Sequence, residues 1–172
     1  FIPVFAKYQK QGHQWEFTTA LLQISLLLFL AITFLAFFFL EPLSKILVPG
    51  IQKEDPRHIA LFVNLTRFIL LAQISFVFSY FCTGILQSYQ RFLIPATAPI
   101  FYNMGIIGGT VLLAPQFGMY GVALGIVAGD FLHFFIQLPF VLRLGFSPQL
   151  TRKFFHPGVR EIAILMAPRT LS

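Results

Sequence analysis

One long apolar stretch limits what this chain can fold into. Between Arg91 and Arg143 the only charged or weakly basic side chains are Asp130 and His133. A membrane-spanning helix needs about 20 apolar residues, so this stretch is too long for one crossing and about right for two. The break Pro115-Gln116-Phe117-Gly118 combines a helix-breaking proline with a glycine, which indicates a turn. The stretch therefore predicts a hairpin of two transmembrane helices.

The composition of the whole chain agrees with a membrane protein. Of its 172 residues, 57% are hydrophobic and 10% are charged, whereas a soluble domain has about 25% charged residues. A soluble core of this length cannot absorb so much apolar surface. The net charge of +6 does not indicate a nucleic-acid partner, because the basic residues lie singly at the ends of apolar runs, where topology determinants lie. We expect an all-α polytopic membrane protein.

Further apolar runs, separated by polar connectors with turn signals, extend this prediction to a single transmembrane helical domain over residues 1–172. Both ends look cut, because the chain begins with Phe1 and closes on the start of an apolar helix, so we expect a fragment of a longer protein. Glu41-Pro42 is expected to end the second helix. The expected helices are residues 1–6 (the end of a helix), 17–40, 58–90, 93–114, 119–142 and 159–172 (the start of a helix).

Lysine and arginine are unevenly divided between the connectors. With four complete crossings, seven of them fall on one side of the membrane and four on the other. The positive-inside rule places the richer side in the cytoplasm. That side collects Lys7, Lys10, Arg91, Arg143, Arg152, Lys153 and Arg160, and the other side collects Lys45, Lys53, Arg57 and Arg67.

Glycines recur every four residues in both helices of the hairpin. Gly105 and Gly109 lie in the first helix, and Gly121, Gly125 and Gly129 lie in the second. In lipid, small residues at this spacing let two helix backbones approach closely. We interpret these rows as helix packing rather than as a ligand site.

The second glycine row continues into His133 and Gln137, and Asp130 lies beside it. An ionisable residue at membrane depth is costly to bury, so it is by default a functional hypothesis. Asp130 and His133 are three residues apart, close enough on a helix to form a polar pair and to relay protons. The alternative is that Asp130 bonds to a neighbouring helix and only stabilises the bundle.

Ser75, Ser79, Thr83 and Gln87 form another four-residue row, on the helix before the hairpin. Hydroxyl groups at this spacing either line a wet cavity or bond back to their own helix. If the row lines a cavity, Asn103 in the next helix faces the same space. We take these five residues as candidate cavity-lining residues.

Arg67 is a further candidate cavity-lining residue. It lies one or two turns inside the helix expected over residues 58–90. Its guanidinium either binds an anionic group or extends to the membrane surface.

No sequence pattern indicates catalysis or metal binding. The sequence contains no glycine-rich phosphate loop and no GxSxG elbow. It also contains no group of histidines, cysteines and carboxylates at the spacing of metal ligands. Cys82 lies alone in an apolar run, without a CxxC pattern. We therefore expect no catalytic residue, no metal ion and no cofactor.

Ordered blocks of sequence carry a family resemblance. Residues 1–8 read Phe-Ile-Pro-Val-Phe-Ala-Lys-Tyr, and residues 86–92 read Leu-Gln-Ser-Tyr-Gln-Arg-Phe. In their order and spacing, these and later blocks resemble the MurJ (MviN) family of lipid II flippases over essentially the whole chain. The later blocks are Pro95-Ala96-Thr97-Ala98-Pro99, Tyr120-Gly121-Val122-Ala123-Leu124-Gly125, Gln137-Leu138-Pro139, Leu144-Gly145-Phe146, His156-Pro157-Gly158-Val159-Arg160 and Leu165-Met166-Ala167-Pro168.

The resemblance implies a transporter, not an enzyme, of the multidrug/oligosaccharidyl-lipid/polysaccharide exporter superfamily. Such proteins have two helical lobes in a MATE-like fold, and this chain would cover part of the N-terminal lobe, from the end of helix 2 to the start of helix 7. The family moves lipid II, the undecaprenyl-linked peptidoglycan precursor, across the bacterial inner membrane by alternating access. The implied partners are this lipid-linked oligosaccharide, the membrane lipids and the cell-wall synthesis machinery.

The resemblance carries over only part of the family's site. The family's substrate-binding arginines lie mainly in the first two helices and in the second lobe, outside this chain. Asp130 departs from the family pattern, which has a small or apolar residue there. The alternatives are another exporter of the superfamily, for a polysaccharide-lipid or a drug, a non-transporting scaffold, or a polytopic membrane enzyme acting on isoprenoid-linked sugars. Such an enzyme needs clustered carboxylates or histidines at one membrane face, and this sequence has none.

Overall fold

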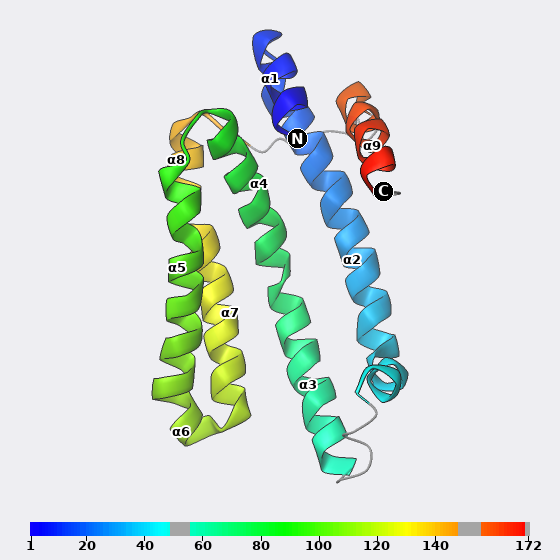
Figure 1. The fold of residues 1–172 in the computed structure, drawn as a ribbon, viewed down its shortest axis with the longest axis vertical. Coiled ribbons are helices and arrows are strands. Elements are labelled where there is room, and N and C mark those ends of the chain that lie inside the picture. Colours follow the sequence, from blue (N-terminus) through cyan, green and yellow to red (C-terminus); the bar gives the residue numbers. More distant parts are fainter. Residues whose placement is uncertain (49–55, 148–155, 171–172) are drawn as a thin grey trace.

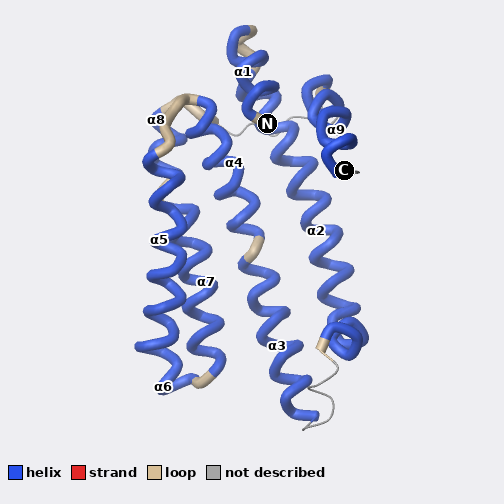
Figure 2. Tube along the Cα trace, viewed as in Figure 1, coloured by secondary structure: helices blue, strands red, loops and turns tan. Residues whose placement is uncertain are grey.

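The computed structural model describes residues 1–48, 56–147 and 156–170, which form helices joined by short turns (Figure 1). No strand occurs among these residues (Figure 2). Lys53, Arg152 and Lys153, which the charge count assigned to connectors, lie outside the described residues. In chain order the helices are α1 (Ile2–Lys10), α2 (Gln14–Leu47), α3 (Pro56–Ala72), α4 (Ile74–Ser88), α5 (Leu93–Gly108), the π-helical turn η2 (Gly109–Leu113), α6 (Ala114–Phe117), α7 (Met119–Phe135), α8 (Leu138–Arg143) and α9 (Pro157–Thr170).

Within the described residues, four helical spans are long and apolar enough to cross a membrane: Gln14–Ile46, Arg57–Ser88, Leu93–Phe117 and Met119–Arg143. They run along the long axis of the molecule (Figure 1). α1, α8 and α9 gather at one end, here called the α1 end, and α6 lies at the opposite end. The chain is an all-α, multi-pass membrane protein, as its composition predicts.

Two helices continue past the ends that the sequence predicts. α2 runs through Pro42 to Leu47, so the expected end at Glu41-Pro42 is wrong. A proline inside a helix removes one backbone hydrogen bond and bends the helix without having to end it. Here the Ser44 hydroxyl donates to the Glu41 carbonyl at 2.7 Å and so supports the bent turn. α1 extends to Lys10, because its polar residues are good helix formers, and the chain turns at Gly12, where φ is +76°.

Two spans that the sequence predicts as continuous helices are interrupted. The span of α3 and α4 has a turn at Gln73, where the Phe76 N–H bonds to the Gln73 carbonyl, a tighter spacing than that of an α-helix. The span of α7 and α8 breaks at Ile136-Gln137. Pro139 follows that break and supplies no N–H, so the regular series of helical backbone hydrogen bonds cannot continue through it.

The hairpin turn is shorter than the predicted four-residue break. The helical path continues from α5 through η2 and α6 to Phe117, with Pro115 in the first turn of α6, where a missing N–H costs little. Gly118 alone makes the turn, with φ at +57°, a backbone conformation that favours glycine. Its N–H bonds to the Ala114 carbonyl at 2.8 Å, and α7 starts at the next residue.

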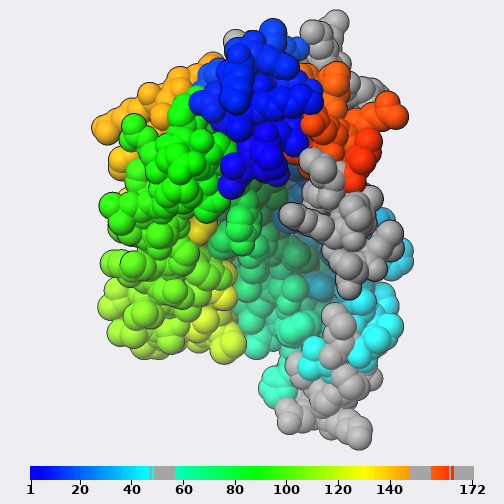
Figure 3. All heavy atoms as spheres, turned by 45° about the horizontal axis from the view of Figure 1, so that its top comes forward, coloured from blue at the N-terminus to red at the C-terminus, as the bar shows by residue number. Residues whose placement is uncertain are grey.

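A buried apolar core joins five helices at the α1 end. Figure 3 shows this end in space-filling form, with α1 in blue between the green α4–α5 turn and the red-orange start of α9. Phe5 and Leu86 at its centre are fully buried. This core positions α1 and α9 against α2, α4 and α8. Its residues are Val4, Phe5, Phe17, Cys82, Ile85, Leu86, Val141 and Ile162.

The glycine rows lie at the contact between α5 and α7. A Cβ added to Gly109 would lie 2.3 Å from the Cα of Gly125, and one added to Gly105 would lie 2.4 Å from the Cα of Gly129. A Cβ added to Gly121 would meet the backbone of η2 at Leu113. The two backbones are therefore in direct contact, an approach that only small residues allow.

We expect Gly125→Ala to destabilise the protein, because its new Cβ would lie 2.6 Å from the Cα of Gly109 and the helices would have to separate. Overpacking of this kind costs about 1–3 kcal/mol, which would lower the thermal unfolding midpoint of the purified full-length protein in detergent. Gly108→Ala is the matched control, since no atom lies within 4 Å of its added Cβ. Equal unfolding midpoints for the two variants would contradict the packing role.

Candidate functional site

A groove of about 720 Å³ opens between the start of α1, α2, α4 and α9. Its walls are mainly apolar, and none of the described side chains that line it carries a charge. Hydrogen-bonding groups on the walls come from Ser25 of α2 and from Tyr80, Thr83 and Gln87 of α4. The groove can therefore hold a ligand by apolar contact and neutral hydrogen bonds.

The row predicted on α4 divides between this groove and the helix interface behind it. Thr83 and Gln87 line the groove. Ser79 is fully buried and bonded to α7, while Ser75 is nearly buried and donates to the Ala72 carbonyl of its own span. The division has a geometric reason: residues four apart on an α-helix are offset by about 40° around the axis. Over three such steps the row turns from one face of α4 to another.

Two further candidate cavity-lining residues lie elsewhere. Asn103 is exposed on α5, outside the groove lining. The Nε of Arg67 donates to the Phe37 carbonyl of α2 at 3.2 Å, and its guanidinium lies 5.0 Å from the centroid of the Phe37 ring. Arg67 thus connects α3 to α2 through backbone and ring contacts, an arrangement that neither sequence interpretation of this residue included.

A chain of side-chain hydrogen bonds crosses from α4 to α7 and to the break that follows it. The Thr83 hydroxyl donates to Oε1 of Gln137 at 2.8 Å, and Nε2 of Gln137 donates to the Ser79 hydroxyl at 2.8 Å. The Ser79 hydroxyl lies 2.6 Å from Nδ1 of His133. We call these four residues, Ser79, Thr83, His133 and Gln137, the polar ladder. One end of the ladder, Thr83, belongs to the groove wall.

The polar ladder also explains how the break after α7 is stabilised. At the break the Gln137 N–H bonds to the Phe134 carbonyl, so the His133 carbonyl loses its regular helical donor. The Ser79 hydroxyl and Nε2 of Gln137 approach that carbonyl at 3.1 Å and 3.0 Å. A buried carbonyl without a donor would be costly, and the ladder supplies two. Gln137 was not predicted as a site residue, although it continues the four-residue row of His133.

Asp130 does not form the polar pair with His133 that the sequence suggested. Nδ1 of His133 bonds to Ser79 of α4 instead, and the ring of Phe76 packs beside the imidazole at 5.1 Å between centroids. The Asp130 side chain is 0% exposed. Neither of its carboxylate oxygens has a hydrogen-bond partner in the part of the chain that the structure describes.

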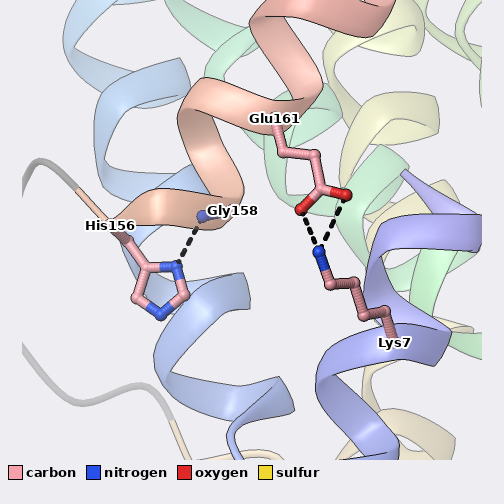
Figure 4. A network of polar contacts seen from close by, with 4 residues as sticks. All are labelled: Lys7, His156, Gly158 and Glu161. Atoms are coloured by element: carbon pink, nitrogen blue, oxygen red, sulfur yellow. Dashed lines mark hydrogen bonds and ion pairs between the residues drawn. The ribbon is translucent and has the colours of Figure 1, made fainter.

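A separate polar cluster ties α9 to α1 at the α1 end (Figure 4). The Lys7 amine lies 2.8 Å and 3.1 Å from the two Glu161 carboxylate oxygens. The hydrogen bond to Glu161 raises the pKa of Lys7 above its usual value. At the start of α9, the Gly158 N–H donates to Nδ1 of His156 at 3.1 Å. No local sequence pattern points to this cluster, because Lys7 and Glu161 are separated by 154 positions.

Comparison with known proteins places the chain in a family. The family model described as lipid II flippase MurJ matches residues 1–172. The lipid II flippase MurJ of Burkholderia cenocepacia is 29% identical over 183 residues, which cover 100% of this chain and 35% of that protein. The probable lipid II flippase MurJ of Buchnera aphidicola is 29% identical over 176 residues, which cover 99% of this chain and 34% of that protein.

A third relative, the probable lipid II flippase MurJ of Borreliella burgdorferi, is 35% identical over 88 residues, which cover 51% of this chain and 17% of that protein. The chain spans about a third of the length of the first two of these relatives. The family model nevertheless matches the chain from its first residue to its last, including the four candidate membrane spans found among the described residues. The chain belongs to the lipid II flippase MurJ family.

Proposed function

We propose that residues 1–172 form part of the N-terminal lobe of a two-lobed, MATE-like flippase that moves undecaprenyl-linked lipid II across the bacterial inner membrane by alternating access. The observation that carries this proposal is the family match over the whole chain. The protein acts as a transporter and not as an enzyme. Its substrate connects it to the enzymes that make and consume that precursor in peptidoglycan synthesis.

The groove supports this function physically. The polar headgroup of a lipid-linked oligosaccharide has to cross about 30 Å of hydrocarbon, while its isoprenoid tail stays in the lipid. Such a ligand needs apolar walls with neutral hydrogen-bonding groups, and Ser25, Thr83 and Gln87 supply those groups here. In this proposal, arginines in other parts of the full-length protein bind the negatively charged pyrophosphate.

Basic residues support an orientation with the α1 end in the cytoplasm. Lys7 and Lys10 end α1, Arg91 lies in the α4–α5 turn, Arg143 ends α8 and Arg160 lies in the first turns of α9. These elements gather at one end of the molecule (Figure 1). Short connectors rich in lysine and arginine stay on the cytoplasmic side of the membrane.

The polar ladder serves as the support of the groove wall in this proposal. It fixes α4, which carries Thr83 and Gln87, against the interrupted span of α7 and α8. The hydrogen-bonded ladder fixes the rotation of α4 about its own axis, and that rotation decides which side chains face the groove. The groups that meet the headgroup are therefore held in position before it binds.

The flippase function is tested by rescue of cells depleted of their own lipid II flippase. The full-length protein should restore growth and normal cell shape, because it would resupply precursor to the outer leaflet. Immunoblotting of membrane fractions verifies insertion, and empty vector is the control. Failure to rescue by a correctly inserted protein would contradict the assignment to lipid II.

The supporting role of the ladder is tested by Gln137→Leu. This change removes the side-chain partner of Thr83 and one partner of Ser79, which keeps its contacts with His133, and a buried polar group left without a partner costs about 1–3 kcal/mol. We expect a lower thermal unfolding midpoint in detergent and weaker rescue of growth.

Thr110→Val is the matched control for the ladder. The Thr110 hydroxyl is exposed and bonds only within its own span, to the Ile106 carbonyl at 2.8 Å. This control should keep the wild-type midpoint and rescue. A Gln137→Leu protein as stable and active as the Thr110→Val protein would rule out the supporting role.

A further inference from the structure

Asp130 is a buried acid that neither the groove nor the polar ladder uses. It lies near the middle of the span Met119–Arg143, on α7. Its side chain is 0% exposed, and both carboxylate oxygens lack a hydrogen-bond partner among the described residues. Buried carboxylates are normally paired or hydrogen-bonded, so this one needs a chemical explanation.

The elements packed against α7 bring no cation to Asp130. From α5, the backbone and ring of Tyr102 lie against Gly129, the residue before Asp130. From α4, Phe76 lies between the rings of Tyr102 and His133, at 5.4 Å and 5.1 Å. On α3, Arg67 is directed to Phe37 of α2.

The remaining titratable groups of these elements do not meet the Asp130 carboxylate either. His133, on the same helix, is bonded to Ser79 of α4. Arg57 and His58 lie at the start of α3, and Arg143 lies at the end of α8. All three are near the ends of their membrane spans, whereas Asp130 is near the middle of its own. Tyr80 of α4 lines the groove, and Cys82 is part of the apolar core. η2 and α6 contain no titratable side chain.

An ionised carboxylate in this setting is strongly disfavoured, because burying an unpaired charge costs far more free energy than any single contact contributes. A bound proton cancels the charge without further ligands. A metal cation would need several oxygen ligands around it, and the described residues gather no group of three His, Cys, Asp or Glu side chains that could hold one. The chemistry of the position therefore fits a proton.

We propose that Asp130 is a proton-binding site in the interior of this helical bundle, and that proton exchange there is coupled to transport. The coupling rests on the flippase function proposed above. The step is a proton transfer alone: a proton from water adds to one carboxylate oxygen to give the neutral acid, and the same proton leaves in the reverse step. The charge of the site changes by one, and no electron or other group moves.

The polar ladder gives this site a connection to the groove. It runs from Thr83 in the groove wall to His133, which lies one helical turn from Asp130. The Ser79 hydroxyl donates to the His133 carbonyl at 3.1 Å and lies 2.6 Å from Nδ1 of His133, which donates or accepts according to the tautomer of the ring. A rearrangement of α4 that opens the groove would thus also change the surroundings of the acid.

The coupling follows from the difference in charge between the two states. The neutral acid is compatible with the closed packing around α7, whereas the ionised form favours any arrangement that admits water to it. A ligand shifts a conformational equilibrium by as much as its affinities for the two states differ. The proton is that ligand here, and a pH difference across the membrane would bias the exchange between the two arrangements.

Infrared difference spectroscopy of the full-length protein tests proton binding directly. Between two pH values at which the site exchanges its proton, wild type should show the C=O stretching band of a carboxylic acid free of strong hydrogen bonds. Asp130→Asn should lack that band. Glu41→Gln is the matched control, because Glu41 is an exposed carboxylate at the far end of α2, and it should keep the band. A band that persists in Asp130→Asn, or is absent from wild type, overturns the site.

Reconstituted liposomes test the coupling. Translocation of a fluorescent lipid-linked oligosaccharide is measured with and without a pH gradient, while valinomycin and potassium hold the membrane potential at zero. A gradient of about one pH unit changes the ratio of acid to carboxylate up to about tenfold. Wild type and Glu41→Gln should respond to the gradient, and Asp130→Asn should translocate at one rate with either sign of gradient. An unchanged gradient response in Asp130→Asn overturns the coupling.

The two tests separate this inference from the flippase proposal. If the wild-type protein in liposomes does not translocate the lipid-linked oligosaccharide, both the flippase function and the coupling are overturned. The infrared band would still decide whether Asp130 binds a proton. If Asp130→Asn does not insert into membranes, Asp130→Glu takes its place. That variant keeps an acid, so the band should shift in frequency and the gradient response should remain, and an unshifted band overturns the assignment to Asp130.

Discussion

The direct backbone contact between α5 and α7 is the interaction on which the rest of the structure depends. Gly105 and Gly109 meet Gly125 and Gly129 with no side chain between them. Lipid tails are as apolar as leucine, so helices in a membrane gain little from hydrophobic contact with each other, and close van der Waals packing has to hold them together. This contact fixes the rotation of α7 and thereby decides which of its side chains are directed to α4. His133 and Gln137 are part of the polar ladder for that reason.

The break between α7 and α8 depends on the same ladder. A span interrupted at Gln137 leaves the His133 carbonyl without its helical donor, and inside a membrane no bulk water replaces that donor. Ser79 and Gln137 donate to it instead. The interruption and the polar groups therefore stabilise each other: the break frees the carbonyl that the ladder binds, and the ladder makes the break tolerable in lipid. We infer that a substitution which restores a regular helix at residue 137 would also displace the ladder.

The sequence predicts the parts of this structure that depend on spacing along one helix. Charge-free length predicts the hairpin, the four-residue glycine rows indicate where α5 meets α7, and a proline-glycine break indicates the turn. The sequence does not predict features that depend on hydrogen-bond donors or acceptors from a neighbouring helix. α7 stops at Phe135 and Arg67 bonds to Phe37, and in both cases a hydrogen-bond partner on another helix takes part. α2 continues through Pro42 for a local reason, the bond from the Ser44 hydroxyl to the Glu41 carbonyl. The Lys7–Glu161 contact joins residues too distant in sequence for any local pattern to indicate it.

The groove and the buried acid lie on different sides of α4, and this separation bears on how a flippase of this kind would work. None of the described side chains that line the groove is charged, whereas Asp130 is part of α7, which packs against α4 and α5. A proton on Asp130 therefore does not touch a ligand in the groove. Any influence of one on the other has to pass through the position of α4, which carries Thr83 and Gln87 on one face and Ser79 on another. Such coupling acts through the rotation of one helix, so the polar ladder is the element whose rearrangement would link the two sites.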